Sequence, residues 1–343
     1  MKRVLDRSSG EPSLLSGYPT KRESVAPIVA HLGGEFSFTH LAARKAFTDA
    51  SFRSCEQISS VFKEVSTGLS AYGIIPVESS SQGVFSSTLD ELLASHKDGV
   101  RIVQEIVQQE KLALVTHPSL SELDIVSVVG HPVILEICSS YLAMIDVRRG
   151  LAGKQPLIRL PALDSTKACQ ATRADPTAAA ISNKESAEAN ALSVLVAHVG
   201  YDANNETRYL VVTSTLRSEI LYGISPPRRL KCTIAFGCSN VPGSIFRWSS
   251  CFALRDVNVI KAQSRPAVQG ALGGTSGLRH FDSLFIVDYE VPEKEKNSAL
   301  LTAISEFTTW LKILGSYGAV DDISHVEPNK DIEWRETSDI LLS

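Results

Sequence analysis

The feature that most constrains the fold is an alternation of apolar, strand-like runs with helix-like segments between residues 28 and 212. The runs at 72–77 (YGIIPV) and 194–199 (VLVAHV) are short and apolar, as expected of buried strands. Residues 55–66 instead carry their apolar side chains on one helical stripe. Because strands that alternate with helices over such a span are typical of α/β proteins, we predict a parallel, doubly wound α/β fold in two lobes.

The pattern changes after a linker at residues 225–229 (SPPRR). Strand-like and helix-like runs then follow in the order βαββα, which is typical of an α+β sandwich of ferredoxin-like type. The expected strands are 232–236, 257–262 and 282–290, and the expected helices are 244–254 and 299–311. A glycine-rich insert at 270–277 is expected to be a loop between strands.

These changes divide the chain, which at 343 residues is too long for one ordinary core, into four segments. They are a flexible N-terminal extension at 1–27, an α/β domain at 28–224, a second domain at 229–318 and a polar tail at 319–343. Within the α/β domain, lobe one is expected at about 28–104 plus 192–224, and lobe two at about 105–191.

Charge and cysteine content narrow the class of protein. The formal net charge of −4 argues against nucleic acid or an anionic membrane as the main partner, and no apolar run reaches the roughly 18 residues of a membrane span. Residues 1–27 lack the apolar core of a secretory signal. The six cysteines form no CxxC pair and no zinc-like cluster with histidine, so we expect reduced, mostly buried thiols, no metal, and a cytoplasmic protein.

Two stretches can hold an anion. At 204–212 (NNETRYLVV) a polar turn places Thr207 and Arg208 at the start of a strand, where a proton donor and a cation can meet a ligand. Residues 33–40 combine a glycine turn with Ser37 and Thr39 at a helix N-terminus. The structural alternatives are a turn before a buried strand, with Arg208 as a surface charge, and a simple helix cap.

Two other polar segments are candidates with equally plain alternatives. The loop at 78–83 (ESSSQG) follows a buried strand at the carboxyl end, where open α/β sheets bind ligands. It can also be a serine-rich connector. His131 precedes a proline, and a hydrogen-bonded turn residue is the more ordinary role for it.

Taken together, the chain resembles the monofunctional prephenate dehydratases and their arogenate dehydratase relatives over roughly residues 28–318. The matching stretches occur in the order of that family: GGEFSFTHLAA (33–43), YGIIPVESSSQG (72–83), GHPVILEIC (130–138), STKAC (165–169), AAAIS (178–182) and NETRYLVV (205–212). In the second domain, NVPGSIF (240–246), VNVIKAQSRP (257–266), FIVDYE (285–290) and LGSYG (314–318) are similar to the regulatory ACT domain of the family. The resemblance implies a two-lobed catalytic domain similar to periplasmic binding proteins, followed by an ACT domain.

The resemblance also implies a reaction and a site. Such enzymes convert prephenate to phenylpyruvate, with loss of water and carbon dioxide, and use no cofactor. The Thr-Arg-Phe motif of the family falls on Thr207, Arg208 and Tyr209. Thr207 would position or protonate the leaving hydroxyl, Arg208 would face a substrate carboxylate, and the rest of the site would come from Glu78, Ser79, Ser80, Ser81, Ser37, Thr39, His131 and Tyr209.

Departures from the family leave three functions open. The glutamate-asparagine pair reads Glu78-Ser79, and the Ser-His-Pro-Gln stretch reads Gly130-His131-Pro132-Val133. Serine replaces an amide donor only in part, and valine does not replace it at all. The chain is therefore expected to be a prephenate dehydratase, an arogenate dehydratase, or a catalytically weak sensor of an amino acid.

The resemblance finally implies feedback regulation by phenylalanine at the junction of two ACT domains, and hence a homo-dimer or homo-tetramer. The effector would contact two segments. The residues are Asn240, Pro242, Gly243, Ser244, Ile245 and Phe246 in the first, and Gln263, Ser264, Arg265 and Pro266 in the second.

Overall fold

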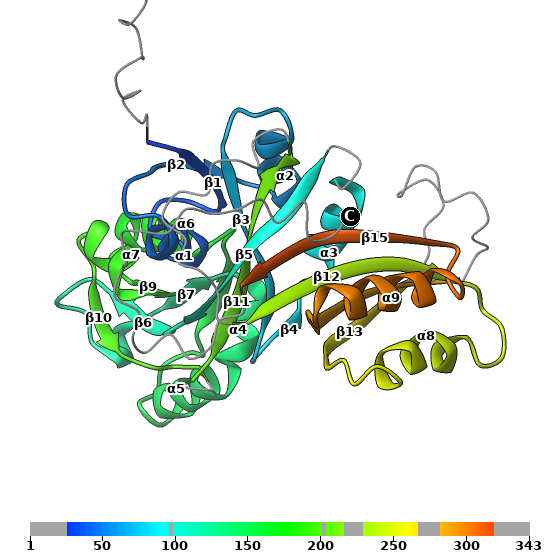
Figure 1. Ribbon diagram of the computed structural model, residues 1–343. Coiled ribbons are helices and arrows are strands. Elements are labelled where there is room, and N and C mark those ends of the chain that lie inside the picture. Colours follow the sequence, from blue (N-terminus) through cyan, green and yellow to red (C-terminus); the bar gives the residue numbers. More distant parts are fainter. Residues whose placement is uncertain (1–25, 96–98, 201–203, 216–228, 267–281, 319–343) are drawn as a thin grey trace, which may run out of the picture.

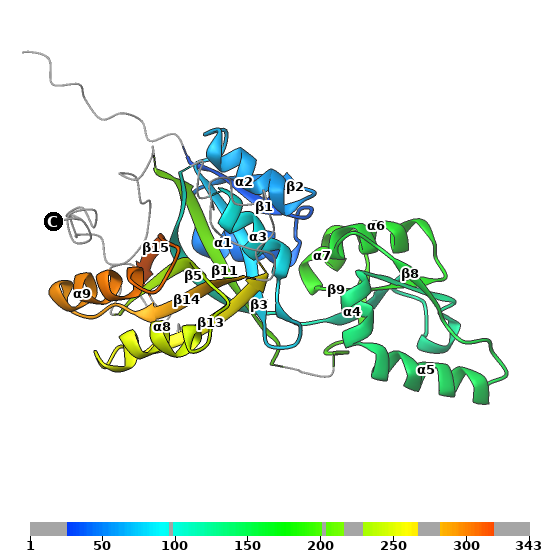
Figure 2. The same cartoon turned by 90° about the vertical axis from the view of Figure 1, so that its right-hand side faces the viewer.

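The computed structural model describes residues 26–95, 99–200, 204–215, 229–266 and 282–318. Figure 2 shows three parts in a row, with lobe one in the middle, lobe two on one side and the second domain on the other. Four predicted segments lie wholly or almost wholly outside the described residues. They are the N-terminal extension, the linker that begins at residue 225, the glycine-rich insert at 270–277 and the polar tail.

Lobe one is built on strands of mixed direction. In the order β5-β11-β3-β1-β2, they are β5 (Val100–Gln109), β11 (Glu206–Ser214), β3 (Tyr72–Ser79), β1 (Ile28–Leu32) and β2 (Ser51–Cys55), and the short β4 (Gly83–Val84) pairs with β3. β1 is parallel to β2 and β3, but β11 is antiparallel to both of its neighbours. The expectation of an all-parallel sheet is therefore wrong, because β11 enters the sheet from lobe two. The helices of this lobe are α1 (Phe38–Ala46), α2 (Ile58–Ser66) and α3 (Ser86–Ser95).

Lobe two has its own five-stranded mixed sheet. Its order is β10-β6-β9-β7-β8, with β10 (Ser193–Val196), β6 (Ala113–Thr116), β9 (Ala178–Ser182), β7 (Ser127–Gly130) and β8 (Ile158–Pro161). The helical elements are η2 (Glu122–Asp124), α4 (Pro132–Ile137), α5 (Ser139–Leu151), α6 (Ser165–Ala174) and α7 (Lys184–Ala189). The helical run after His131 is divided into α4 and α5 at Cys138, whose backbone leaves the helical region at ψ 5°.

The chain passes between the lobes twice, and the two passages lie side by side. Leu112 accepts a backbone hydrogen bond from Val199 (2.9 Å), and Glu110 donates one to Asn205 (2.8 Å). The structure places the outward passage after Gln109 rather than near residue 105, because β5 pairs with β11 as far as Gln109. It places the return after β10 rather than near residue 192, because β10 pairs with β6 in the sheet of lobe two.

The second domain has the connectivity βαββαβ. It comprises β12 (Leu230–Cys238), α8 (Ser244–Ala253), β13 (Val259–Pro266), β14 (Ser283–Glu290), α9 (Lys294–Ser305) and β15 (Trp310–Gly318), and its antiparallel order β13-β14-β12-β15 is that of a ferredoxin-like fold. The helix expected at 299–311 is wrong at its C-terminal end, since a fourth strand follows α9. Leu311 and Ile313 alternate along that strand and pack onto the core beneath the helices.

One ten-stranded sheet joins the second domain to lobe one, as Figure 1 shows for β15 and β5. These two strands meet in parallel at Gly315 and Ile102, where a Cβ on Gly315 would overlap the carbonyl oxygen of Ile102. A shared core lies alongside, in which Leu210 and Val212 of β11 cluster with Ile286 of β14. The second domain is therefore packed against the strand that carries Thr207 and Arg208.

Two further expectations concern thiols and membranes. All six cysteines lie among the described residues, are buried and form no disulfide, in agreement with the prediction of buried thiols. In the described ranges, no helix has both the length and the apolar character needed to cross a membrane.

Candidate functional site

Strand β11 presents Thr207 and Arg208 to opposite sides of the sheet. Tyr209 and Val211, on the side of Thr207, pack in the core beneath α1 with Ala42. Leu210, on the side of Arg208, packs in the core shared with the second domain. Because side chains alternate along a strand, one substrate pressed against β11 cannot meet Thr207 and Arg208 from the same side.

The side of Thr207 carries a buried group of polar side chains that we call the hydroxyl–carboxyl cluster: Thr39, Glu110, Thr207 and Tyr209. Tyr209 donates a short hydrogen bond from its phenol to Oε1 of Glu110. Thr207 is 1% exposed, and its hydroxyl makes no hydrogen bond of standard geometry within the described part of the chain. It nevertheless lies close enough to the Glu110 carboxyl to lower the pKa of that group.

Burial controls the protonation of this cluster. It raises the pKa of Glu110 to about 7, although the hydroxyls of Tyr209 and Thr207 oppose the shift by stabilising the carboxylate. Burial, followed by Glu110, also raises the pKa of Tyr209 well above its ordinary value. Near neutral pH the cluster therefore holds a neutral phenol and a carboxyl group that can exist in either protonation state.

The N-terminus of α1 borders this cluster through Thr39, which acts on the Tyr209 phenol. Ser37 is the helix cap: its hydroxyl accepts from the backbone N–H of His40 (3.3 Å) and donates to the carbonyl of Leu32 (3.1 Å). Ser37 is therefore a helix cap, as the structural alternative predicted, whereas the binding of substrate by Ser37 stays a prediction.

A buried pair of histidines lies under the same turn. His31 and His40 stack with ring centroids 4.7 Å apart, and His40 Nδ1 accepts a hydrogen bond from the backbone N–H of Phe36 (2.7 Å). Burial and then the neighbouring His40 lower the pKa of His31 to about 4, and burial also lowers the pKa of His40. Both rings are consequently neutral at physiological pH.

Lobe two meets the same turn through three direct hydrogen bonds. Asp164 Oδ2 accepts from the backbone of Gly34 (3.0 Å), Thr166 donates to the carbonyl of Glu35 (2.7 Å), and Asn183 donates to the carbonyl of Phe36 (2.9 Å). Asp164 also caps α6 by accepting from the N–H of Lys167, which is the role that an aspartate before a helical run ordinarily has. The cap uses one carboxylate oxygen of Asp164, and the sequence does not indicate that the second oxygen contacts the other lobe.

His131 lies at the same junction of the lobes. Burial lowers its pKa, and the charge of the nearby Asp164 opposes the shift. The ring precedes α4 as its N-cap residue without capping it by a side-chain hydrogen bond. The structure thus places His131 near Asp164, which holds the turn at 33–37 through Gly34, whereas the binding of substrate by His131 stays a prediction.

The serines after β3 hold the turn that precedes Thr207. The side-chain oxygen of Asn205 accepts from the hydroxyl of Ser79 (2.7 Å), from the hydroxyl of Ser80 (3.2 Å) and from the backbone N–H of Ser81 (3.2 Å). Asn205 is 1% exposed, and these three hydrogen bonds fix the position at which the chain enters β11. Asn205 was missed as a functional candidate, since the sequence alone shows it only as a polar turn residue.

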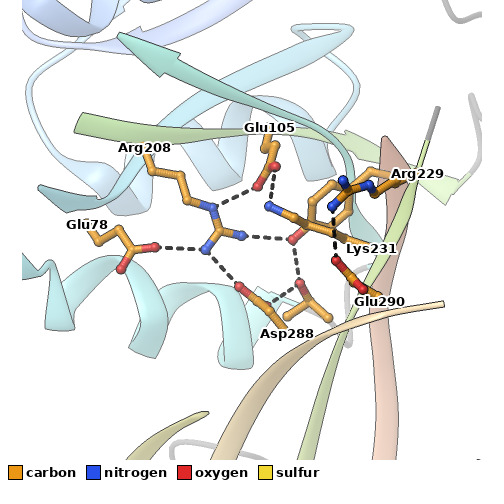
Figure 3. A network of polar contacts seen from close by, with 9 residues as sticks. Glu78, Glu105, Arg208, Arg229, Lys231, Asp288 and Glu290 are labelled. Atoms are coloured by element: carbon orange, nitrogen blue, oxygen red, sulfur yellow. Dashed lines mark hydrogen bonds and ion pairs between the residues drawn. The ribbon is translucent and has the colours of Figure 1, made fainter. Parts of the chain in front are cut away.

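Arg208 occupies the centre of an ion-pair network between lobe one and the second domain, shown in Figure 3. Its guanidinium donates to Glu105 (2.9 Å), Glu78 (2.9 Å), Asp288 (2.7 Å) and the hydroxyl of Tyr317 (2.9 Å). Lys231 pairs with the other oxygen of Glu105 (2.6 Å), and Lys261 pairs with Glu78. We call this group the domain-interface network.

This network changes the interpretation of two candidates. Burial lowers the pKa of Arg208, but Asp288, Tyr317 and Glu105 raise it by more, so the guanidinium is permanently charged. Its side chain is 11% exposed and already has three carboxylate partners. The alternative of Arg208 as a surface charge disagrees with this geometry, whereas the roles of Arg208 and Glu78 at the substrate stay predictions.

The two predicted effector segments face different surroundings. Gly243 adopts φ +78° before α8, where Ile245 and Phe246 are exposed (60% and 74%). On β13, Arg265 pairs with Asp90 of α3 (2.5 Å), and Gln263 borders a small cavity beside Arg208. The alternate residues Ser264 and Pro266 are exposed on the other side of β13.

The described ranges contain no group of three or more His, Cys, Asp or Glu side chains placed to hold a metal ion. The chemistry offered at the lobe junction is that of hydroxyls, backbone amides, neutral imidazoles and one carboxyl group of raised pKa. The fold and the site therefore define a two-lobed α/β protein with a proton-donating cluster, followed by a ferredoxin-like domain.

Comparison with known proteins identifies the family. The profile of the prephenate dehydratase family matches residues 29–216, which is more than half of the chain. The chain is 31% identical over 292 residues to the bifunctional chorismate mutase/prephenate dehydratase of Aquifex aeolicus, with 84% of this chain and 73% of that protein covered. It is 28% identical over 294 residues to arogenate dehydratase/prephenate dehydratase 2 of Arabidopsis thaliana, with 84% and 72% covered. The chain belongs to the prephenate dehydratase family, as its sequence motifs predict.

Solved structures agree on the fold. The prephenate dehydratase of Arthrobacter aurescens in complex with L-Phe superposes with a TM-score of 0.71 at 21% identity, over 87% of this chain and 92% of that one. A protein described as a quorum-quenching acylase superposes with a TM-score of 0.69, also at 21% identity, over 85% and 98%. At such identity the likeness shows the fold alone, so the activity must be argued from the site and the family.

Proposed function

We propose that the protein is a prephenate dehydratase, which removes the ring hydroxyl and the ring carboxylate of prephenate to give phenylpyruvate. The Thr207 hydroxyl carries this proposal. It is buried, it makes no hydrogen bond of standard geometry within the described residues, and it lies close to the carboxyl group of Glu110. A buried hydroxyl that makes no hydrogen bond of standard geometry is costly to keep unless a ligand uses it.

The surroundings of Thr207 suit an anionic substrate that must be held in one orientation. The first turn of α1 is a favourable place for an anionic group, and His131 lies near Asp164 on the side of lobe two. A substrate held between the two lobes would be shielded from water, which would strengthen each hydrogen bond to the reacting groups. Aromatisation of the ring provides the driving force, so the protein needs to supply only orientation and a proton.

Arogenate is the alternative substrate, and it differs in carrying an amino group where prephenate has a keto group. Relatives named for arogenate, for prephenate or for both share the same family, so the choice needs an assay. Purified protein should be incubated with each substrate while phenylpyruvate and phenylalanine are measured. Formation of phenylpyruvate from prephenate is expected, and formation of phenylalanine from arogenate alone would assign the second activity.

A catalytically weak sensor is the remaining alternative, and it rests on Ser79 and Val133. The hydroxyl of Ser79 is used by Asn205, and Val133 is 38% exposed. Neither position supplies an amide donor to the lobe junction. We nevertheless favour an active enzyme, because Thr207 retains both its hydroxyl and a neighbouring acid.

We further propose that the second domain is an ACT domain that binds phenylalanine between two copies of the chain. Val241, Ile245 and Phe246 form an exposed apolar surface at the start of α8. Such a surface fits a second copy of the domain, and the structure of the Arthrobacter aurescens prephenate dehydratase in complex with L-Phe suggests the effector. Since Gln263 and Arg265 face lobe one, we assign the direct contacts to the first segment together with Ser264 and Pro266.

A further inference from the structure

Glu110 is a buried carboxyl group for which sequence analysis gave no role. It follows β5 directly at the outward passage between the lobes, and its backbone N–H is bonded to Asn205 on the return passage (2.8 Å). The residue is 7% exposed. A carboxyl group in such a position needs a partner or a function, because burial without either is unfavourable.

Strand pairing brings Glu110 close to Thr207, because Thr207 is opposite Gln108 and the N–H of Glu110 reaches the carbonyl of Asn205. Tyr209 donates its phenol hydrogen to Oε1 of Glu110, and Tyr209 and Thr207 lie on the same side of β11. The phenol stands where the family motif carries a phenylalanine, so this chain has added a hydroxyl where a carboxyl group can use it. The groups that act on Glu110 from the described elements are these two hydroxyls, and no charged side chain is among them.

The reaction consumes one proton. The prephenate dianion and one proton give the phenylpyruvate monoanion, carbon dioxide and water. A threonine hydroxyl is by itself a poor acid, so it can pass a proton on only if another group replaces it. We propose that Glu110 is a proton-relay residue that acts through Thr207, an inference that rests on the proposed function.

One proton passes from Glu110 through Thr207 to the leaving hydroxyl. The bond between the ring carbon and the hydroxyl oxygen breaks, and that oxygen takes the proton of Thr207 Oγ1 to leave as water. Thr207 takes the carboxyl proton of Glu110, which becomes a carboxylate stabilised by the Tyr209 phenol. The electron pair of the bond to the departing carboxylate moves into the ring, and carbon dioxide leaves. Solvent returns a proton to Glu110 after the products depart.

The relay predicts how kcat depends on pH. Glu110 must be protonated at the start of the cycle, and its pKa is raised to about 7 by burial. Activity should therefore be full below that pH and fall about tenfold per unit above it. Tyr209 lowers the pKa of Glu110 by donating to the carboxylate, so its loss should move this alkaline limb to higher pH.

The test compares kcat against pH for the wild type, Glu110→Gln, Tyr209→Phe and a control, Glu206→Gln, which makes the same charge change at an exposed position on β11. Glu110→Gln should lower kcat by about a hundredfold at pH 6 and abolish the alkaline limb. Tyr209→Phe should shift the limb upward in pH, a result that a purely structural role would not produce. Glu206→Gln should keep the wild-type limb.

The outcomes separate this proposal from the proposed function. An active wild type whose alkaline limb is retained in Glu110→Gln, with kcat within twofold, would overturn the relay alone. If Glu110→Gln fails to fold, as judged by near-ultraviolet circular dichroism, an unmoved limb in Tyr209→Phe would overturn it. A wild type inactive on both prephenate and arogenate would overturn the proposed function and the relay with it.

Discussion

Thr207 combines a cost to stability with a benefit to catalysis. Its buried hydroxyl has no standard partner within the described residues, and such a group destabilises a fold by about 1–3 kcal/mol. Thr207→Val removes the hydroxyl at nearly constant shape. We expect an unchanged or higher free energy of unfolding in urea, together with a loss of at least about a hundredfold in kcat. Near wild-type turnover would show that the hydroxyl does not act on the leaving group.

At Arg208 the effect of positive charge can be separated from the effect of hydrogen-bonding geometry. Arg208→Lys keeps the positive charge but cannot reach Glu105, Glu78, Asp288 and Tyr317 together. We expect the free energy of unfolding to fall by about 1.5–3 kcal/mol or more, since at least one charge-assisted hydrogen bond is lost. The same substitution at Arg148, an exposed ion pair in lobe two, is the control.

The kinetics of Arg208→Lys distinguish two roles. A network that joins domains predicts a loss of stability with little change in KM. A large rise in KM at unchanged stability would instead support the role at a substrate carboxylate that the sequence suggested.

At the scale of elements, the contact between β15 and β5 makes the two domains one sheet. Gly315 allows this approach, because a side chain there would overlap the backbone of Ile102. Gly315→Val should separate β15 from β5 while the core under α8 and α9 stays intact. Differential scanning calorimetry should then resolve two transitions where the wild type shows one. A single transition in the variant would mean that the domain-interface network alone couples the domains, and Ser316→Ala on the same strand is the control.

At the scale of the whole molecule, phenylalanine should bind only where two copies meet. Gly243 adopts φ +78°, which a β-branched side chain scarcely tolerates. Gly243→Val should abolish phenylalanine binding measured by calorimetry while leaving uninhibited activity largely intact. Phe246→Asp should place a charge on the apolar surface and lower the oligomeric state measured by analytical ultracentrifugation. A wild type that is monomeric, or that binds no phenylalanine, would contradict the proposed effector site.

Local physics accounts for what the sequence determined by itself. The cap at Ser37, the cap at Asp164 and the strand that begins near Thr207 depend on neighbours within a few residues, and all three are present. The βαββα order of the second domain was also predicted from the sequence, but its final strand, β15, was not. Its apolar residues fit a helix or a strand, and pairing with β12 decides between them.

Tertiary structure decided which groups meet. The period of two along β11 shows that Thr207 and Arg208 point to opposite sides, yet only the packed molecule shows that one side meets α1 and the other meets the second domain. Glu110 and Tyr209 are separated by 99 positions and touch because β5 and β11 are adjacent. Such contacts depend on long-range strand pairing, and the raised pKa of Glu110 depends on its burial. Neither can be read from the spacing of residues along the chain.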